Sequence, residues 1–320
     1  MYDGIININK PSGFTSHDVI AKLRGILHFK KIGHTGTLDP LACGVLLLCL
    51  GSATRLCDMM PDKGKCYRGR MKFGFETDTE DITGEVLRSC EMKITEEELE
   101  KALNSFIGTY NQMPPMYSAK RIEGKRLYEY ARSGQEIERK SCEVIIKDIK
   151  LEEVIKNEQG FIEEAVIFVE CGSGTYIRSL IRDIGYKLNG FACMTELTRT
   201  KVGDFSLENS YTLEDIERLV KEGNERTAKM KVDLAFPNLP KLVTVAESDY
   251  LLDNGNPIRY DELICEDGRL LSESDIIKNE NVYRMYTSTG YFYGLYERKR
   301  SNYILFPKKM FVPDIYRRKE

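Results

Sequence analysis

A single aspartate stands in an unusual loop of this 320-residue chain. The stretch GHTGTLDPLACGVL, residues 33–46, contains three glycines and one histidine, and Asp39 lies in it between a leucine and a proline. An Asp-Pro pair is typical of a turn, because proline keeps the residue before it out of helical geometry. A carboxylate in this place could also act as a nucleophile. On the loop alone, a turn residue is the favoured interpretation.

Other residues of the loop, together with residues from distant segments, make a catalytic role of Asp39 more plausible. The glycines of the loop would let a bulky ligand approach the backbone closely. Three flat side chains offer surfaces on which a nucleobase could stack, namely His34, Tyr67 and Tyr176. Arg178 follows a Gly-Ser-Gly turn at the start of an expected helix, so it could pair with Asp39 and keep the carboxylate ionised and oriented. If these groups meet in the fold, Asp39 becomes a candidate for catalysis.

Other kinds of chemistry lack their sequence signatures. The chain contains neither the G-x-S-x-G of serine hydrolases nor the G-x-x-x-x-G-K-[ST] of phosphate-binding loops. The acidic stretch 76–85 hints at calcium ligands but is out of register for an EF-hand, so we interpret it as a turn or a solvated surface. Three scattered histidines and nine cysteines without a C-x-x-C pair predict reduced thiols and no metal site. A metal-dependent hydrolase built on residues 76–85 is therefore a distant alternative.

Charge is distributed unevenly along the sequence, although the net charge is only −3. Residues 1–72 hold eleven Lys and Arg against five Asp, residues 76–101 hold ten acids against three bases, and residues 117–140 hold seven bases against four Glu. The first and third segments could form a phosphate-binding face, and a solvated charged surface is the alternative. The longest apolar run, Val45 to Leu50, is too short for a membrane span, and no secretory signal is recognisable, so we expect a cytoplasmic protein.

Hydrophobic patterns predict an α+β fold with a central mixed, mainly antiparallel sheet flanked by helices. Residues 44–51 form a continuous apolar run, which is typical of a buried central strand. Residues 66–75 alternate, which predicts a strand with one core face and one basic face. The further expected elements are helices at 15–28, 95–108 and 212–223, a strand, a turn and a helix within 163–189, a short helix near 125–134 and a strand at 194–205. After about residue 235, short strands separated by turns predict a small β-rich domain.

Taken together, these segments resemble one family closely, the TruB-type tRNA pseudouridine synthases of bacteria. The resemblance covers about residues 4–220 in the family's order. The matching segments are GIININKPSGFTSHDV at the amino-terminal motif, KIGHTGTLDPLACGVLLLCLGSATRL at the catalytic loop, KCYRGRMKFGFETDTEDITGEV at the K-x-Y and G-x-x-T-D-T-x-D-x-x-G motifs, QMPPMYSAKRIEGKRLYEYARSG at the RNA-gripping thumb, and GSGTYIRSLIRDIG and LTRTKVGDF at the last two active-site motifs.

The resemblance implies a role for each candidate residue. Asp39 is implied to be the nucleophile, Arg178 its salt-bridge partner, and Tyr67 the side chain that stacks on the target uracil and a candidate for the proton-abstracting base. The implied substrate-binding set is His34, which would enter the RNA loop in place of the flipped base, Tyr176 and Leu197, which would line the pocket, and Lys10, which with Pro11 would support the catalytic loop from behind. The side chains expected to hold RNA phosphates are Lys30, Lys31, Lys120, Arg121, Lys125 and Arg126.

One position departs from the family pattern. Cys43 stands where the resemblance leads us to expect Ser or Thr. A thiol is similar in size to a hydroxyl but a poorer hydrogen-bonding group. We therefore expect a weaker contact bracing the loop, with no consequence for the roles of Asp39, Tyr67 and Arg178.

The implied activity is isomerisation of uridine to pseudouridine at position 55, in the TΨC loop of tRNA, by base flipping and covalent catalysis through Asp39. The carboxylate would attack either C1′ of the sugar or C6 of the base. No cofactor and no metal is expected, because the reaction involves no redox change and no energy input. We expect a monomer with a catalytic domain at 1–235, its thumb at about 112–140, and a PUA-like RNA-binding domain at 240–320. The alternative is a tRNA-binding or folding factor that does not require catalysis.

Overall fold

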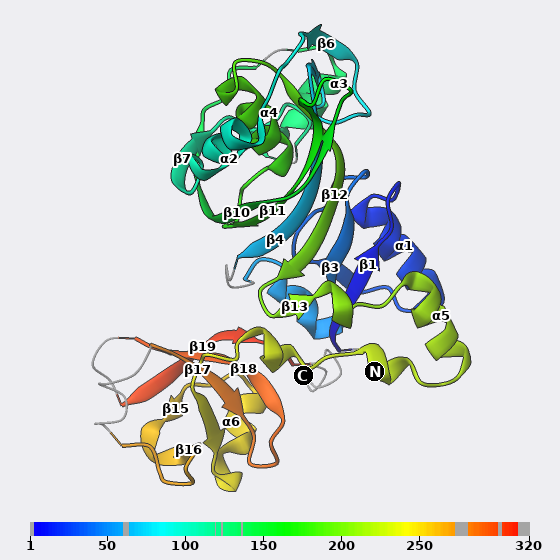
Figure 1. Cartoon of the computed structure of the whole chain (residues 1–320). Helices are drawn as coiled ribbons and strands as arrows, with labels where there is room; N and C mark the ends of the chain where they lie inside the picture. The colour runs from blue at the N-terminus through cyan, green and yellow to red at the C-terminus, as the bar shows by residue number, and fades with distance from the viewer. Residues whose placement is uncertain are drawn as a thin grey trace.

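In the part of the chain that the structure describes, a nine-stranded sheet carries or borders most of the predicted site residues (Figure 1). The computed structural model describes residues 3–59, 64–118, 120–122, 124–135, 137–272, 281–299 and 303–312. The main path of the sheet runs β1-β3-β12-β4-β11-β10-β7, while β2 pairs with β3 and β13 with β12. The strands are β1 Gly4–Lys10, β2 Ile32–His34, β3 Cys43–Leu50, β4 Lys65–Phe73, β7 Gly108–Gln112, β10 Cys142–Lys156, β11 Ile162–Cys171, β12 Ala192–Val202 and β13 Phe205–Ser206.

The pairing within this sheet agrees with the predicted fold class. Strands β3 and β12 run parallel through Thr198 opposite Cys43, and the other paired neighbours run antiparallel. Two small ribbons lie outside it, one formed by β5 (Phe75–Thr77) with β6 (Val86–Ser89), and one formed by β8 (Arg121–Ile122) with β9 (Lys125–Arg126). The prediction of a mixed, mainly antiparallel sheet is confirmed.

Strand β3 is buried on both faces, which explains its uninterrupted apolar sequence. Leu46 and Leu48 pack into one core together with apolar residues of α1 and α4. Leu47 faces a second core, to which Leu295 and Phe311 of the C-terminal part also belong. The loop that bears Asp39 leads directly into this strand, so its end is attached to the most deeply buried element of the sheet.

Six α-helices occur in the described residues, and three of them start with the capping box that the sequence signals. Thr15, Thr95 and Thr212 each accept a hydrogen bond from the third helical residue, whose carboxylate in turn accepts one from the threonine. The helices are α1 Ser16–Leu27, α2 Glu96–Asn104, α3 Leu127–Arg132, α4 Ile177–Lys187, α5 Leu213–Lys221 and α6 Asp249–Asp253. The helix predicted at 15–28 is confirmed, and it ends where His28 adopts a left-handed conformation with φ of 48°.

Helix α2 ends earlier than predicted. The sequence predicts a helix that continues to Gly108, whereas α2 stops at Asn104 and Gly108 already begins β7 with φ of 104°. The intervening chain turns so that the ring of Phe106 packs edge-on against Tyr110, with their centroids 5.2 Å apart. The need to enter β7 therefore overrides the local helical pattern.

The cations on the basic face of β4 form ion pairs, so this part of the first basic segment fits the alternative of a charged surface and not that of a phosphate-binding face. Each of its cations contacts glutamates on neighbouring strands. The ion pairs join Arg68 to Glu152 and Glu153, Arg70 to Glu164 and Glu196, and Lys72 to Glu163 and Glu164. These partners come from β10, β11 and β12, so a charge count along one segment could not anticipate them.

A second sheet of six strands follows the first, in the order β15-β19-β18-β17-β14-β16 (Figure 1). Its strands are β14 Lys241–Thr244, β15 Ile258–Arg259, β16 Leu263–Cys265, β17 Val282–Tyr286, β18 Phe292–Arg298 and β19 Ile304–Met310. This sheet has a core of its own, which includes Tyr283, Tyr296 and Leu305. We propose a domain division between residues 235 and 240, just before β14. Within the described ranges, no helix is long and apolar enough to span a bilayer.

Candidate active site

Lys10 holds the Asp39 loop from behind. Its side chain is fully buried, and its ammonium donates hydrogen bonds to the carbonyls of Pro11, Phe14 and Pro40. Burial lowers the pKa of Lys10 to about 8. The structure therefore places Lys10 under the loop and outside the described lining of the cavity, where it holds the backbone.

The loop itself is a hydrogen-bonded turn on which Ser16 also acts. The N–H of Ala42 donates to the carbonyl of Asp39 at 3.1 Å, which closes the turn that the Asp-Pro pair predicts. Ser16 Oγ accepts a 2.9 Å hydrogen bond from the N–H of Leu38 and donates to the carbonyl of the same residue. The backbone on the amino-terminal side of the aspartate is thus held through both of its polar groups.

Arg199 fastens the other side of the loop. Only 2% of its surface is exposed, and its guanidinium donates to the carbonyls of Gly36 at 3.1 Å, Thr37 at 3.3 Å and Val45 at 2.7 Å. Gly44 lets strands β3 and β12 approach each other closely, because a Cβ at this position would lie 2.3 Å from the carbonyl oxygen of Arg199. Its φ of 100° also favours glycine. Sequence reasoning missed Arg199, although it stands two residues after Leu197 in the matching motif LTRTKVGDF.

We predict that Arg199→Met lowers the free energy of unfolding by about 3 kcal/mol, because three loop carbonyls lose their buried donor. Urea unfolding of the two proteins measures the difference. Lys201→Met, at an exposed position on the same strand, is the matched control and should change stability by less than about 0.5 kcal/mol. An unchanged urea midpoint for Arg199→Met would contradict the role of Arg199 in holding the loop.

Arg178 reaches the Asp39 loop from the first turn of α4. Its Nε lies 2.9 Å from Oδ2 of Asp39, and only 5% of its side-chain surface is exposed. The rest of the guanidinium is held by the opposite wall, where it donates to the carbonyls of Thr79 at 2.8 Å and Tyr117 at 2.9 Å and pairs with Asp81 at 3.4 Å. The expected pair of Asp39 with Arg178 is therefore present, and the arginine arrives in a single fixed orientation.

The acidic stretch 76–85 is a turn, but its interpretation as a solvated surface was wrong. Glu80 and Asp81 are both buried against α4. Glu80 pairs with Arg182 and accepts a hydrogen bond from Ser179, while Asp81 contacts Arg178. The acids of this stretch therefore orient two arginines of one helix, a long-range role that local spacing does not reveal.

The carboxylate of Asp39 lines a cavity and lies in an environment that shifts its pKa. About a third of its side-chain surface, 35%, is exposed. Burial raises the pKa of Asp39 above its ordinary value of 3.8, and the guanidinium of Arg178 and the ammonium of Lys10 oppose that rise. Arg178 therefore favours the ionised form that a nucleophile requires.

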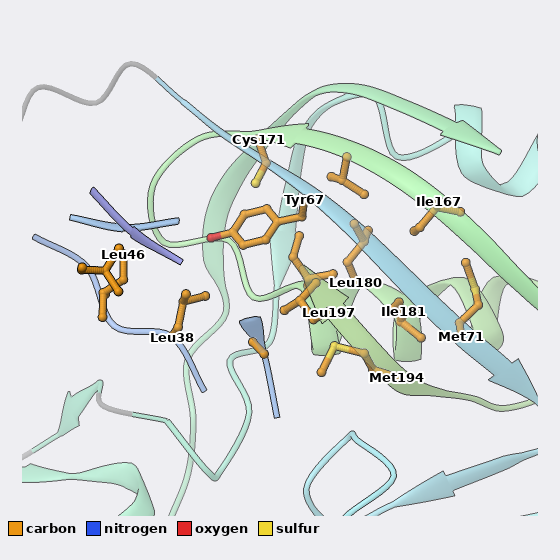
Figure 2. Packing of buried hydrophobic residues seen from close by; sticks show 14 of the residues in the cluster. Leu38, Leu46, Tyr67, Met71, Ile167, Cys171, Leu180, Ile181, Met194 and Leu197 are labelled. Atoms are coloured by element: carbon orange, nitrogen blue, oxygen red, sulfur yellow. The ribbon is translucent and has the colours of Figure 1, made fainter. Parts of the chain in front are cut away.

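A cavity of about 540 Å³ opens beside this pair. Tyr67, Tyr176 and Leu197 all line it with Asp39, so the structure brings these predicted site residues together. Figure 2 shows Tyr67 extending from β4, with its hydroxyl on the side of Leu38 and Leu46 and away from Met71 and Ile181. Burial raises the pKa of Tyr67, and the nearby Arg199 opposes that rise. An aromatic ring, an aliphatic floor and one carboxylate suit a flat, mostly uncharged ring.

His34 lies next to the cavity, at the end of β2, and does not contribute to its lining among the described residues. Its ring meets that of His17 edge-on, with centroids 5.6 Å apart. Burial lowers the pKa of His34, as does the charge of His17. Within the described chain, Nδ1 of His34 has no hydrogen-bond partner. The lowered pKa favours the uncharged form of the ring, whose flat face can stack on a base.

The expected phosphate-binding residues lie in two places. Lys30 and Lys31 are exposed just before β2. Arg121 and Lys125 are exposed on the β8–β9 ribbon, and Lys120 lines the mouth of the cavity with Nζ 2.5 Å from Sγ of Cys142. The side chain of Arg126 lies outside the described residues. Cationic side chains thus occur beside the loop and on the segment above the cavity.

Cys43 forms a side-chain contact with the neighbouring strand β12. Its Sγ lies 3.1 Å from Oγ1 of Thr198, across the parallel pairing of β3 with β12. The thiol therefore still joins the loop to the strand that carries Arg199.

Comparison with known sequences identifies the family. The model of the TruB family pseudouridylate synthase N-terminal domain matches residues 24–177, and the model of the tRNA pseudouridylate synthase B C-terminal domain matches residues 178–247. A tRNA pseudouridine synthase B of Lachnoclostridium phytofermentans is 45% identical over 97% of this chain and 100% of its own length. The chain belongs to the TruB family. A tRNA pseudouridine synthase B of Clostridium tetani is 42% identical over 94% of this TruB-family chain and 97% of its own length. The chain is accordingly a pseudouridine synthase, which is an isomerase.

Solved structures support the same fold. A chain in the crystal structure of a Cbf5-Nop10-Gar1 complex superposes on 98% of this TruB-family chain and 86% of its own length, with a TM-score of 0.70 and 26% identity. A chain in an archaeal box H/ACA sRNP Nop10-Cbf5 complex has a TM-score of 0.68 at 24% identity, over 99% of this chain and 88% of its own. The predicted pseudouridine synthase fold is confirmed.

Proposed function

We propose that this synthase converts uridine to pseudouridine at position 55, in the TΨC loop of tRNA, with Asp39 as its nucleophile. The relatives named tRNA pseudouridine synthase B support tRNA as the substrate. The observation that carries the proposal is the 2.9 Å ion pair of Arg178 with Asp39 at a cavity lined by Tyr67. One oriented carboxylate beside an aromatic ring is what the isomerisation of a base requires.

The reaction detaches uracil from C1′ of the ribose, turns the base, and reattaches it through C5. Asp39 forms a transient covalent bond at either C1′ of the sugar or C6 of the base, and in both cases it must be ionised when it attacks. A base must also remove a proton, from C5 at the end or from C2′ if a glycal forms. Tyr67 is the candidate, because its hydroxyl faces the loop side of the cavity.

The target base has to leave the RNA stack before Asp39 can reach it. Base flipping costs on the order of a few kcal/mol. We propose that stacking on Tyr67 and entry of the His34 ring into the vacated space offset part of this cost. His34 suits this role because it ends β2, two residues before Gly36 of the cavity lining, and its lowered pKa favours the uncharged ring.

RNA phosphates would be held by the exposed cations on both sides of the cavity. Lys30 and Lys31 flank the loop, and Arg121 and Lys125 lie on the β8–β9 ribbon within the proposed thumb, residues 112–140. Such contacts make affinity dependent on salt and leave specificity to the shape and bases of the RNA loop. We propose that residues 240–320 form a PUA-like RNA-binding domain, and that the chain acts as a monomer in the cytoplasm, where its cysteines remain reduced.

The decisive experiment uses a tRNA transcript tritiated at C5 of its uridines. Attachment of C1′ to C5 expels the tritium into water, so release counts each isomerisation. We expect release of one tritium per tRNA, and none above background from a transcript that carries cytidine at position 55. If the wild-type protein releases no tritium, the proposed activity is contradicted. Equal release from both transcripts would contradict the assignment of position 55.

We predict that the single-turnover rate falls on the acid side at a pH above 3.8. Burial raises the pKa of Asp39, and protonation removes the nucleophile, so the rate declines as the pH drops through that raised pKa. Rates at saturating enzyme from pH 4 to pH 8 measure the limb, with tRNA affinity determined at each pH as the control. A rate that stays level down to pH 4 would contradict an Asp39 with a raised pKa.

The second candidate function is a tRNA-binding or folding factor that needs no catalysis. The intact grouping of Asp39, Tyr67 and Arg178 argues against a lost active site. The tritium assay separates the two, because a folding factor would bind the transcript without releasing tritium.

A further inference from the structure

Gln112 is a buried residue to which neither the catalytic set nor the RNA-binding set assigns a role. It ends β7, where its backbone pairs opposite Cys142, and only 1% of its surface is exposed. Its amide group meets the backbone of Tyr176 twice. Oε1 accepts a 2.8 Å hydrogen bond from the N–H of Tyr176, and Nε2 donates a 3.0 Å bond to the carbonyl of the same residue.

The two bonds to Tyr176 settle the orientation of this amide, and a third bond holds it further. Nε2 of Gln112 also contacts the hydroxyl of Tyr110 at 2.5 Å. Three of the four hydrogen-bonding positions of the amide are therefore used, and exchange of its oxygen and nitrogen would break the two bonds to Tyr176. The side chain is locked as a two-pronged bracket on one peptide.

That peptide is the start of α4. Tyr176 is the N-cap residue of this helix, and its own side chain makes no capping bond. The carbonyl of Tyr176 accepts the first helical bond from Leu180 at 3.0 Å and, in addition, the bond from Gln112. The bracket therefore supplies, from a distant strand, the acceptor for the N–H of the N-cap residue, and it holds the peptide at which the helix begins.

Two site residues depend on that starting point. Tyr176 itself lines the cavity, and Arg178 stands two residues further along, with its Nε 2.9 Å from Asp39. A shift of the helix start by a fraction of an ångström would move the guanidinium off the carboxylate, and misplacement of about 1 Å can cost a hundredfold in rate. We propose that Gln112 is a positioning residue that aligns Tyr176 and Arg178 for the isomerisation. This inference rests on the proposed function.

The test replaces the amide by a side chain of the same length. Gln112→Met keeps the volume and removes every hydrogen bond to Tyr176. We expect the single-turnover rate of tritium release to fall about ten- to a hundredfold while tRNA affinity stays close to wild type. The melting temperature should fall by only a few degrees, because the N–H of Tyr176 loses its buried acceptor. The acid limb of the rate profile moves to higher pH, because a misaligned Arg178 opposes the raised pKa of Asp39 less well. Asn111→Met, at an exposed position next along the strand, is the matched control and keeps the full rate.

The outcomes separate this inference from the activity itself. A wild-type rate for Gln112→Met, a loss that tracks weaker tRNA binding, or a slower rate with an unmoved acid limb would each overturn the positioning role. If Gln112→Met does not fold, Gln112→Asn decides in the same way, because its amide is uncharged and one methylene too short to keep both bonds to the peptide of Tyr176. No release by the wild-type protein would overturn the proposed function instead. In that case amide hydrogen exchange decides, since a bracket predicts faster exchange at Tyr176 in Gln112→Met and an unchanged rate refutes it.

Discussion

Asp39→Asn is expected to abolish tritium release from tRNA, with a loss of rate on the order of 10⁴-fold or more. The amide has the shape of the carboxylate and can still lie beside Arg178, but it is too weak a nucleophile to form the covalent bond at C1′ or C6. Single-turnover assays with saturating protein measure the effect. The affinity of the variant for tRNA should stay within a few-fold of wild type, because the phosphate contacts come from other residues.

Two results would contradict this role for Asp39. Retention of a full rate by Asp39→Asn removes the aspartate from the covalent step. A loss of rate that follows from lost tRNA binding would show that the aspartate holds RNA instead. Asp58→Asn is a suitable control, because Asp58 is an exposed acid outside the cavity and its substitution should leave the rate unchanged. The folding-factor alternative gains support only if the wild-type protein also releases nothing.

Arg178→Lys is expected to lower the single-turnover rate by about 10²- to 10³-fold, even though it retains a positive charge. The guanidinium spans two walls of the site, with Asp39 on one side and the carbonyls of Thr79 and Tyr117 on the other. A lysine has no planar fork and cannot satisfy these acceptors together. Asp39 then loses its fixed orientation and part of the charge that keeps it ionised.

Arg178→Met tests the electrostatic part separately. It leaves the buried Asp81 without its cation, so we expect a loss of about 3–5 kcal/mol in stability and a shift of the acid limb to higher pH. Rates, urea unfolding and the pH profile are measured on the same preparations. Lys187 is an exposed cation at the end of the same helix, and Lys187→Met should match wild type in all three measurements.

The Arg178→Lys prediction has its own contradicting outcome. If this variant keeps more than half of the wild-type rate, α4 does not orient Asp39.

Patterns within a few neighbouring residues predicted much of the fold correctly. The capping box at Thr15 predicted the start of α1, and the apolar run before Leu50 predicted the buried strand β3, because both signals lie within a few neighbouring residues. Residue types and the family resemblance placed Asp39 and Arg178 together, and they lie 2.9 Å apart.

Contacts between distant segments were beyond such patterns. Glu80 looked like part of a solvated acidic turn, because the arginine that buries it stands about a hundred residues later on α4. Arg199 and Gln112 each act on a backbone far away in the sequence, and neither carries a local signal beyond its presence in a motif. Which glutamates face the cations of β4 depends on strand order, which one segment does not encode.

The doubly buried strand β3 has a consequence for how the protein comes apart. One face of β3 belongs to the core of the catalytic sheet, and the other shares its core with Leu295 and Phe311 near the end of the described chain. The two sheets therefore cannot melt as independent units, since loss of the C-terminal part uncovers Leu47 and its neighbours on that face. A chain shortened to residue 235 would present a water-exposed apolar surface and would tend to self-associate. The Asp39 loop enters β3 directly, so the strand to which it is attached is held in part by residues near the end of the described chain.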